Sequence, residues 1–374
     1  MKTLLFKEQN MKKQVAILTL GGLWNYGNRL QAVALFEALK KLNTEPVAIR
    51  NGWDLDPIPL TNHQPVKAAF EHPFQTLRKY QRKQNFVKFA TRYLERSEFL
   101  DNPRTNQLND LAAFDYVVTG SDQVWNPTIV NDQYFNYFLL EHIPAQKRIS
   151  YAASISVARV DEDASALFKH EVPKFKAASV REQAGVELLQ AITGTDVSVV
   201  LDPTMLLTQA EWSTLFDLDQ IAVPKGKYVF TYVLGQKSPA TLRMIQDFRA
   251  QGYAIVEFHN TDFHQLRKYF AKDPAEFVAF INHAAAVITD SFHAAVFATI
   301  FHTPFTIAER ADQAHQKMSS RIDTLLDMTG LAKRRMAEVD TIAEVLAVDF
   351  AASDARIAER RVESLTFLQA ALRD

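Results

Sequence analysis

The feature that most constrains this chain is a regular alternation of short β-rich runs with helical stretches. Such alternation is typical of parallel sheets, because two parallel strands must be joined by a crossover that is usually a helix. The runs that we predict as strands are 14–20, 46–50, 115–119, 148–154, 176–181, 197–201, 227–234, 253–258, 285–289 and 304–307.

The chain is too long for one hydrophobic core, since 374 residues exceed what a single core usually organises. Asp202-Pro203 interrupts the alternation, and a polar, turn-rich stretch precedes a second series of strands. We therefore expect two doubly wound α/β halves with a cleft between them, an N-terminal domain over 1–205 and a C-terminal domain over 206–345. A helix within 346–374 is expected to pack back on the first domain.

Composition excludes several classes of protein. The 42 lysines and arginines nearly balance the 43 aspartates and glutamates, so no global field favours nucleic acid or a membrane surface. The absence of cysteine removes disulfides, thiolate nucleophiles and zinc–thiolate sites, and it fits a reducing cytoplasm. The N-terminus does not resemble a secretory leader, and no apolar run is long enough to cross a bilayer. A cytoplasmic protein is therefore expected.

Residues 51–110 depart from the alternation, and we expect a helical insertion there. The stretch 74–96 carries seven arginines and lysines and a partial apolar face. A basic amphipathic helix can lie on anionic lipid, which would give at most a peripheral membrane contact. Such a helix is more often a solvated cap over a core.

The segment after the first strand is rich in amides. Gly21 and Gly22 allow a tight turn, and Asn25 or Asn28 can cap the helix that follows. The glycines do not form a dinucleotide-binding fingerprint. Capping explains one asparagine but not Asn25, Asn28 and Gln31 together, and these amides suit hydroxyl-rich ligands such as sugars.

Two further strand ends carry candidate site residues. Ser121, Asp122 and Trp125 follow the third strand, where an aromatic ring beside polar groups suits carbohydrate and Asp122 can serve as a base. The alternative is a turn with a helix cap. Arg181 stands at the end of the fifth strand and can grip a carboxylate or phosphate through two hydrogen bonds. The alternative there is an ion pair with Glu182 or another acid.

The turn 289–293 gives the strongest site prediction. It joins a small-residue strand to an apolar helix, whose first turn offers free backbone N–H groups and a positive dipole end to an anion. Asp290, Ser291 and Phe292 are therefore expected at an anion site, and His293 is the candidate acid or base. Arg321 opens a later helix and either faces the cleft or pairs on the surface. The His259, Asp262 and His264 cluster matches no zinc spacing, and no metal is expected.

Taken in order, these motifs resemble the polysaccharide pyruvyl transferase family. The matching pieces are 25–31 (NYGNRLQ), 114–126 (FDYVVTGSDQVWN), 151–154 (YAAS), 179–182 (SVRE), 201–204 (LDPT), 289–293 (TDSFH) and 301–305 (FHTPF). The resemblance implies two Rossmann-like domains in a glycosyltransferase-B-like fold. It also implies transfer of pyruvate from phosphoenolpyruvate to a hexose of a surface polysaccharide precursor as a cyclic ketal, without a further cofactor. Arg181 and His293 are the catalytic residues that it implies at the phosphoenolpyruvate site.

One departure from the family's pattern matters. Better-characterised members carry an arginine where this chain has Ser291, so the second contact to the donor anion must come from elsewhere, with Arg321 and the helix N-terminus as candidates. The acceptor, free or lipid-linked, is not identified, and a homo-oligomer is compatible with the sequence. Two alternatives stay open: a nucleotide-sugar-dependent glycosyltransferase on a similar fold, and a non-catalytic carbohydrate-binding protein.

Overall fold

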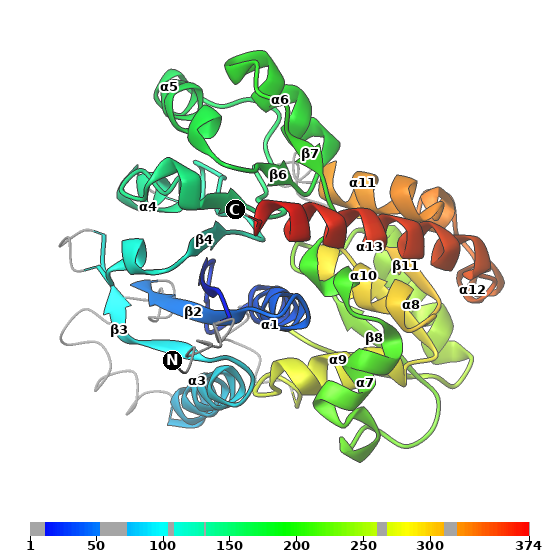
Figure 1. Cartoon of the computed structure of the whole chain (residues 1–374). Helices are drawn as coiled ribbons and strands as arrows, with labels where there is room; N and C mark the ends of the chain where they lie inside the picture. The colour runs from blue at the N-terminus through cyan, green and yellow to red at the C-terminus, as the bar shows by residue number, and fades with distance from the viewer. Residues whose placement is uncertain are drawn as a thin grey trace, which may run out of the picture.

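The computed structural model describes residues 12–52, 73–103, 108–130, 132–259, 268–309 and 320–373. These residues form two separate parallel sheets with helices packed around them (Figure 1). The first sheet has the strand order β3-β2-β1-β4-β5, and the second has the order β11-β10-β8-β9. All the strand pairs within both sheets are parallel. The predicted α/β class is confirmed.

The strands of the first half are β1 (Gln14–Leu18), β2 (Glu45–Asn51), β3 (Arg96–Asp101), β4 (Tyr116–Thr119), β5 (Arg148–Ser150), β6 (Ser179–Val180) and β7 (Ser198–Val199). The short β6–β7 pair continues the first sheet through isolated bridges beside β5. The second half contains β8 (Tyr228–Tyr232), β9 (Ala254–Glu257), β10 (Ala286–Thr289) and β11 (Phe305–Ile307).

Each of the ten predicted strands is present with shifted bounds, but β3 was not predicted. Its sequence RSEFLD lacks an apolar run, and the strand lies at the edge of the first sheet, where one side needs no strand partner. The helical stretch that we predicted at 74–96 is present as helix Pro73–Tyr93, and the unpredicted strand β3 follows it within the same insertion. Within that region, residues 53–72 and 104–107 lie outside the described residues.

The helices are α1 (Tyr26–Lys41), α3 (Pro73–Tyr93), α4 (Asp132–Phe138), α5 (Glu162–Glu171), α6 (Gln183–Thr193), α7 (Gln209–Phe216), α8 (Pro239–Ala250), α9 (Pro274–Asn282), α10 (Phe292–Ile300), α11 (Ser320–Thr329), α12 (Ile342–Leu346) and α13 (Ala351–Ala371). The largest apolar cluster spans both halves, since it joins Val15 and Leu35 of the first half to Phe277 and Phe297 of the second. Two smaller clusters cover the other faces of the sheets. The halves are therefore fixed to each other by a shared core.

The C-terminal helix α13 returns to the first half, as predicted (Figure 1, red). Lys13 Nζ donates to the carbonyl of Leu372 at 2.9 Å, and the Tyr116 hydroxyl donates to the carbonyl of Arg373 at 3.0 Å. Two Rossmann-like halves joined by such a helix form the glycosyltransferase-B-like arrangement that we expected. The exact domain boundaries at 205 and 345 stay a prediction.

Helix α3 is a cap over the core along its C-terminal half, where Phe86 and Phe89 are buried. Arg82 on the same face is also fully buried. Its guanidinium donates to the Tyr26 hydroxyl at 2.8 Å and to the carbonyls of Trp24 and Phe270. Because Phe270 belongs to the second half, this arginine ties α3 to both halves.

A buried cap at α9 predicts a dependence of stability on pH. Asp273 caps α9 and accepts from the Glu276 N–H at 2.8 Å, and burial raises the pKa of Asp273 to about 6 although this hydrogen bond opposes the rise. Burial thus disfavours the charged carboxylate in the folded state. The resulting loss of folding stability is absent below about pH 4, where the carboxyl is protonated in both states, and it grows as the pH rises through 6. An asparagine at this position would keep a capping acceptor without the charge.

We therefore expect Asp273→Asn to raise the free energy of unfolding at pH 7 by on the order of 1 kcal/mol, with no gain at pH 4. Urea unfolding at both pH values measures this. An equal effect of the substitution at both pH values would contradict the burial argument.

Candidate functional site

The candidate site lies where the two sheets reverse their winding direction. In the first sheet this point is between β1 and β4, and in the second it is between β8 and β10. Ligands of doubly wound sheets bind outside the carboxyl ends of strands at such points. The predicted motifs around Asn25, Asp122 and His293 all follow strands that flank the two switch points.

The N-termini of α1 and α10 meet directly between the halves. A Cβ atom added at Gly27 would overlap with Nδ1 of His293. No side chain larger than hydrogen fits there, so Gly27 is what allows the imidazole to lie against the first turn of α1. His293 itself is buried, with 6% of its surface exposed.

Asp202 joins the predicted residues of the two halves into one cluster. Its Oδ2 atom accepts a hydrogen bond from Nη1 of Arg181 at 2.6 Å and lies 3.7 Å from Nε2 of His293. The Ser121 hydroxyl donates to the same oxygen at 3.1 Å. The Oδ1 atom accepts from the backbone N–H and the hydroxyl of Thr204. Both carboxylate oxygens of Asp202 therefore accept hydrogen bonds.

The charges of this cluster stabilise one another. Burial alone would raise the pKa of Asp202, but His293 and Arg181 outweigh it and hold that pKa well below its usual range. Burial likewise opposes the charge on Arg181, whose pKa is nevertheless raised because Asp202, Asp122 and Glu182 surround it. Asp202 is thus ionised at any physiological pH.

Asp202 was missed as a site residue. The only sequence signal at this position is the Asp202-Pro203 pair, which indicates a domain boundary and belongs to one of the motifs that resemble the family. Its function could have been inferred from the strand end that precedes it, but nothing local in the sequence shows that Arg181 and His293 converge on it.

Arg181 lies among acids and against an aromatic ring. Besides the bond to Asp202, its Nη2 lies 3.5 Å from Oδ1 of Asp122, and its guanidinium stands 4.4 Å from the centre of the Phe292 ring. The ion pair that we considered for Arg181 thus exists, with Asp202 and Asp122 as partners. Glu182 points elsewhere, since its Oε1 accepts from the Ser154 hydroxyl and from two backbone N–H groups.

Two of the predicted acceptor amides hold the scaffold. Asn25 caps α1, and its side chain accepts from the backbone N–H of Gly27 at 2.9 Å. Gln31 donates to the Thr19 hydroxyl at 2.7 Å and accepts from the backbone N–H of Ser121 at 3.1 Å. These bonds tie the ends of β1 and β4 together, so both amides position the site from behind.

Trp125 is not placed at the switch point. Its ring is fully buried and contacts Phe168 and Phe175 edge-on, and its Nε1 donates to the carbonyl of Phe138 at 3.2 Å. This placement does not support the predicted contact between Trp125 and a sugar, because no face of the ring is open.

The four predicted donor residues have different positions. The carboxylate of Asp290 accepts from the backbone N–H groups of Leu234 and Gly235, so it fixes the segment after β8. Ser291 is the N-cap residue of α10, yet its side chain makes no capping hydrogen bond. Phe292 supports Arg181. Arg321 is half-buried in the first turn of α11.

Four buried polar atoms around the cluster lack a hydrogen-bond partner within the described part of the chain. They are Asn28 Oδ1, Arg181 Nε, Glu182 Oε2 and His293 Nε2. Buried polar atoms are rarely left unpaired, so these atoms, which belong to the first turns of α1 and α10 and to the end of β6, indicate a ligand or water site. The set contains two oxygen acceptors and two nitrogen atoms, which suits a ligand with both hydroxyl groups and anionic oxygens.

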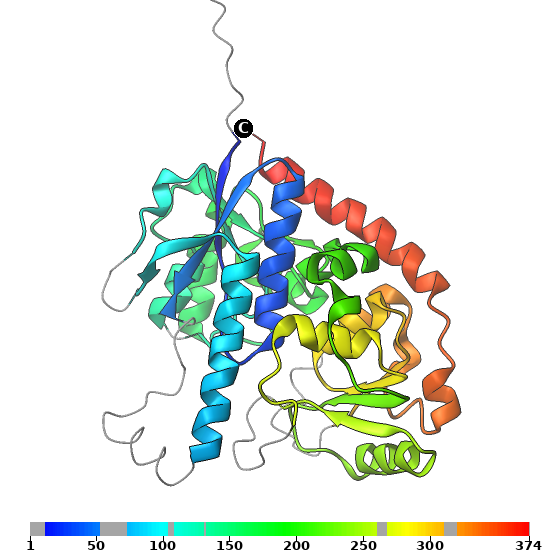
Figure 2. The same cartoon turned by 90° about the horizontal axis from the view of Figure 1, so that it is seen from below.

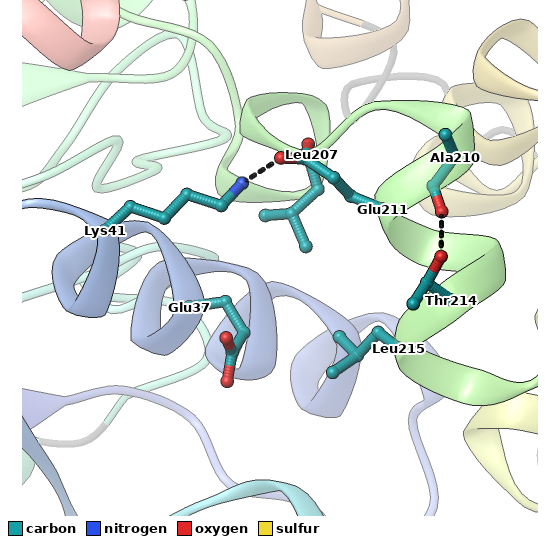
Figure 3. A pocket seen from close by; sticks show the side chains of 7 residues that line it. All are labelled: Glu37, Lys41, Leu207, Ala210, Glu211, Thr214 and Leu215. Atoms are coloured by element: carbon teal, nitrogen blue, oxygen red, sulfur yellow. Dashed lines mark hydrogen bonds and ion pairs between the residues drawn. The ribbon is translucent and has the colours of Figure 1, made fainter.

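Among the residues that the structure describes, no group of His, Asp and Glu side chains has the arrangement of a metal site. Asp262 and His264 lie outside the described residues. A cavity of about 350 Å³ lies between α1 and α7, lined by Glu37, Lys41, Leu207, Ala210, Glu211, Thr214 and Leu215 (Figure 3). It lies at the C-terminal end of α1, about 20 Å along the helix from Gly27 at a rise of about 1.5 Å per residue. This cavity is therefore separate from the cluster.

The contact of Gly27 with His293 makes a testable prediction. Gly27→Ala would push the imidazole aside, and a catalytic group misplaced by about 1 Å can lower kcat on the order of 100-fold. Gly22→Ala is the matched control, since a Cβ at Gly22 would stand 3.5 Å from the Asn28 amide, an ordinary contact. Turnover of both variants is measured beside their thermal unfolding. Equal turnover in the two variants would show that the position of His293 is unimportant.

Loss of the Asp202 charge should destabilise the fold. Asp202→Asn leaves Arg181 buried without its closest carboxylate, which costs about 3 to 5 kcal/mol in comparable sites. Because the folded-state pKa of Asp202 lies below the unfolded one, the contribution is complete above about pH 4 and is lost as pH falls further. The difference in unfolding free energy between parent and variant should therefore shrink below pH 4. A constant difference down to pH 3 would contradict this assignment.

Comparison with solved structures finds resemblances at low sequence identity. A protein from Listeria monocytogenes described as a UDP-N-acetylglucosamine 2-epimerase has 12% identity and a TM-score of 0.47, covering 92% of this chain and 94% of its own. MurG of Acinetobacter baumannii has 10% identity and a TM-score of 0.39, covering 96% and 98%. A search of curated proteins finds no similar sequence.

The family comparison is more specific. The model of the family described as "Polysaccharide pyruvyl transferase" matches residues 25–309, which include helix α1, Arg181, Asp202 and His293. The match covers well over half of the chain and begins at the cap of α1. This chain belongs to the polysaccharide pyruvyl transferase family.

Proposed function

We propose that the protein transfers the pyruvyl group of phosphoenolpyruvate to two hydroxyl groups of a saccharide, forming a cyclic ketal and releasing phosphate. The observation that carries the proposal is the meeting of Arg181 and His293, from opposite halves of the chain, on Asp202. Family membership supports the same class of reaction.

The donor is expected at the N-terminus of α10. The backbone there carries a positive dipole end, and the Ser291 hydroxyl makes no capping bond in competition with a ligand. An additional positive charge is needed, because Arg181 is already faced by Asp202 and Asp122. Arg321 of α11 stays our candidate for that contact.

The chemistry assigns His293 as the acid. It would give its proton to the methylene carbon of phosphoenolpyruvate, so that the adjacent carbon becomes electrophilic and one acceptor hydroxyl adds to it. The C–O bond to phosphate then breaks, and the second hydroxyl adds at the same carbon. Of the two protons lost by the diol, one restores His293 and the other leaves with phosphate. Asp202 keeps the imidazole ring of His293 and the guanidinium of Arg181 in position throughout.

The acceptor is expected on the side of the first half. Asn28 Oδ1 and Glu182 Oε2 are buried oxygens without a partner among the described residues. Both are hydrogen-bond acceptors, so they suit a donor group such as a sugar hydroxyl. Asp122 lies 3.5 Å from Arg181 and is the candidate base for the attacking hydroxyl. A surface polysaccharide precursor is the acceptor that we propose.

The role of His293 is tested by replacing it with glutamine, which is similar in size but is not an acid near neutral pH. We expect His293→Gln to lower phosphate release from phosphoenolpyruvate by about 10² to 10⁴-fold while leaving the unfolding midpoint near that of the parent. Mass spectrometry of the producing cell's surface polysaccharide, with and without the gene, supplies the acceptor and the product.

The two other hypotheses give different results in these experiments. A nucleotide-sugar glycosyltransferase would change the sugar content of the polysaccharide and leave its pyruvyl content intact. A carbohydrate-binding protein would release no phosphate at all. Full activity of His293→Gln would remove His293 from the chemistry.

A further inference from the structure

The N-terminal half of α3 presents an apolar face to solvent. Phe74, Leu77 and Tyr80 are 76%, 52% and 59% exposed, and they follow one another at a spacing of three residues. Phe86 and Phe89, further along the helix, are buried. On a helix of about 3.6 residues per turn, the first three fall nearly opposite the buried pair, so they form a second, outward face. We call Phe74, Leu77 and Tyr80 the outer face of α3.

Most of the charged side chains around this face are cations. Helix α3 contains no aspartate or glutamate, and its cations are Arg78, Lys79, Arg82, Lys83, Lys88 and Arg92. Arg82 is buried, whereas the half-exposed Arg78 and Lys83 flank the outer face. A hollow of about 330 Å³ beside α3 adds Lys268, Lys272 and one acid, Glu276, from the second half, and Glu276 is paired with Lys272. The surface around the outer face is thus basic although the whole chain carries a formal charge of −1.

The outer face lies on the same side of the molecule as the candidate site. Helix α3 is the next described element after β2, whose carboxyl end lies at the same edge of the sheet as the exits of β1 and β4. Figure 2 shows the N-terminal end of α3 (light blue) reaching past the first sheet to the edge of the molecule, beside the second half.

We propose that the outer face of α3 docks on an anionic lipid bilayer. Exposed aromatic and aliphatic side chains flanked by lysine and arginine are the chemistry that binds the interface of such a bilayer. A second copy of the chain fits less well, because two basic faces would repel each other. No described helix is long and apolar enough to cross a membrane, so the proposed contact is peripheral. The proposal does not depend on the pyruvyl transfer chemistry.

Docking in this position would hold the exits of β1 and β4 close to the bilayer. A saccharide acceptor carried on a lipid would then reach the site without leaving the membrane surface. The basic hollow between α3 and α9 would lie beside the lipid headgroups. The proposal therefore favours a lipid-linked acceptor over a free one.

The test uses the full chain and vesicles of phosphatidylcholine with or without phosphatidylglycerol. Each cation near an anionic surface contributes about fivefold to binding, so Arg78→Ser, Lys79→Ser and Lys83→Ser together should lower partitioning on the order of 100-fold. Phe74→Ser with Leu77→Ser should lower it as well. The matched control is α8, where Leu242→Ser, Arg243→Ser and Arg249→Ser remove exposed groups of the same kinds and should have little effect.

Three results would overturn the proposal. The first is that the parent protein binds the anionic vesicles no better than the neutral ones. The second is that the α8 control loses as much binding as the α3 variants do. The third is that the α3 substitutions instead abolish a dimer seen by light scattering. The last result would assign the outer face to a second copy of the chain.

A label provides a readout that does not depend on weakened variants. Because the chain has no cysteine, Leu77→Cys allows one environment-sensitive fluorophore to be attached at the outer face. We expect its emission to shift to the blue on anionic vesicles and not on neutral ones. The same label at Val362→Cys of α13, which is 66% exposed, should not shift. An unshifted label at position 77 would contradict insertion of the outer face.

Discussion

The interaction on which the site depends is the buried contact of one carboxylate with a guanidinium and an imidazole from different halves of the chain. Asp202 follows β7 at the end of the first half, Arg181 follows β6, and His293 opens α10 of the second half. Isolated in the core, any of these charges would be costly. Together with the hydroxyls of Ser121 and Thr204, Arg181 satisfies both oxygens of Asp202, whereas Nε2 of His293 keeps no hydrogen-bond partner among the described residues. The cluster therefore requires both halves to be in place.

This arrangement changes how the donor anion has to be bound. Arg181 is surrounded by Asp202, Asp122 and Glu182, so its charge is not freely offered to a ligand. We infer that Arg181 orients the cluster and stabilises charge that develops during the reaction, while the N-terminus of α10 provides the first contact to the anion. The family's usual arginine is Ser291 here, which leaves the second contact to another cation.

Much of the fold could be predicted from the sequence, because alternation and strand-end glycines and asparagines are local signals. Strand β3 could not, since an edge strand such as RSEFLD needs no apolar run. In the site, the capping role considered for Asn25 is confirmed. Gln31 and Trp125, which we predicted to contact the acceptor, instead make hydrogen bonds within the protein. A polar or aromatic residue at a strand end can face the ligand or the scaffold behind it. Only the contacts distinguish the two, and the same is true of Asp202.

The central claim is that the meeting point of the two halves accepts phosphoenolpyruvate. Titration calorimetry of the parent protein with phosphoenolpyruvate and, separately, with a uridine diphosphate sugar tests it most directly. The account predicts saturable binding of phosphoenolpyruvate that is lost when Arg321 is replaced by glutamine, and no binding of the nucleotide sugar. Binding of the nucleotide sugar in preference to phosphoenolpyruvate would contradict it.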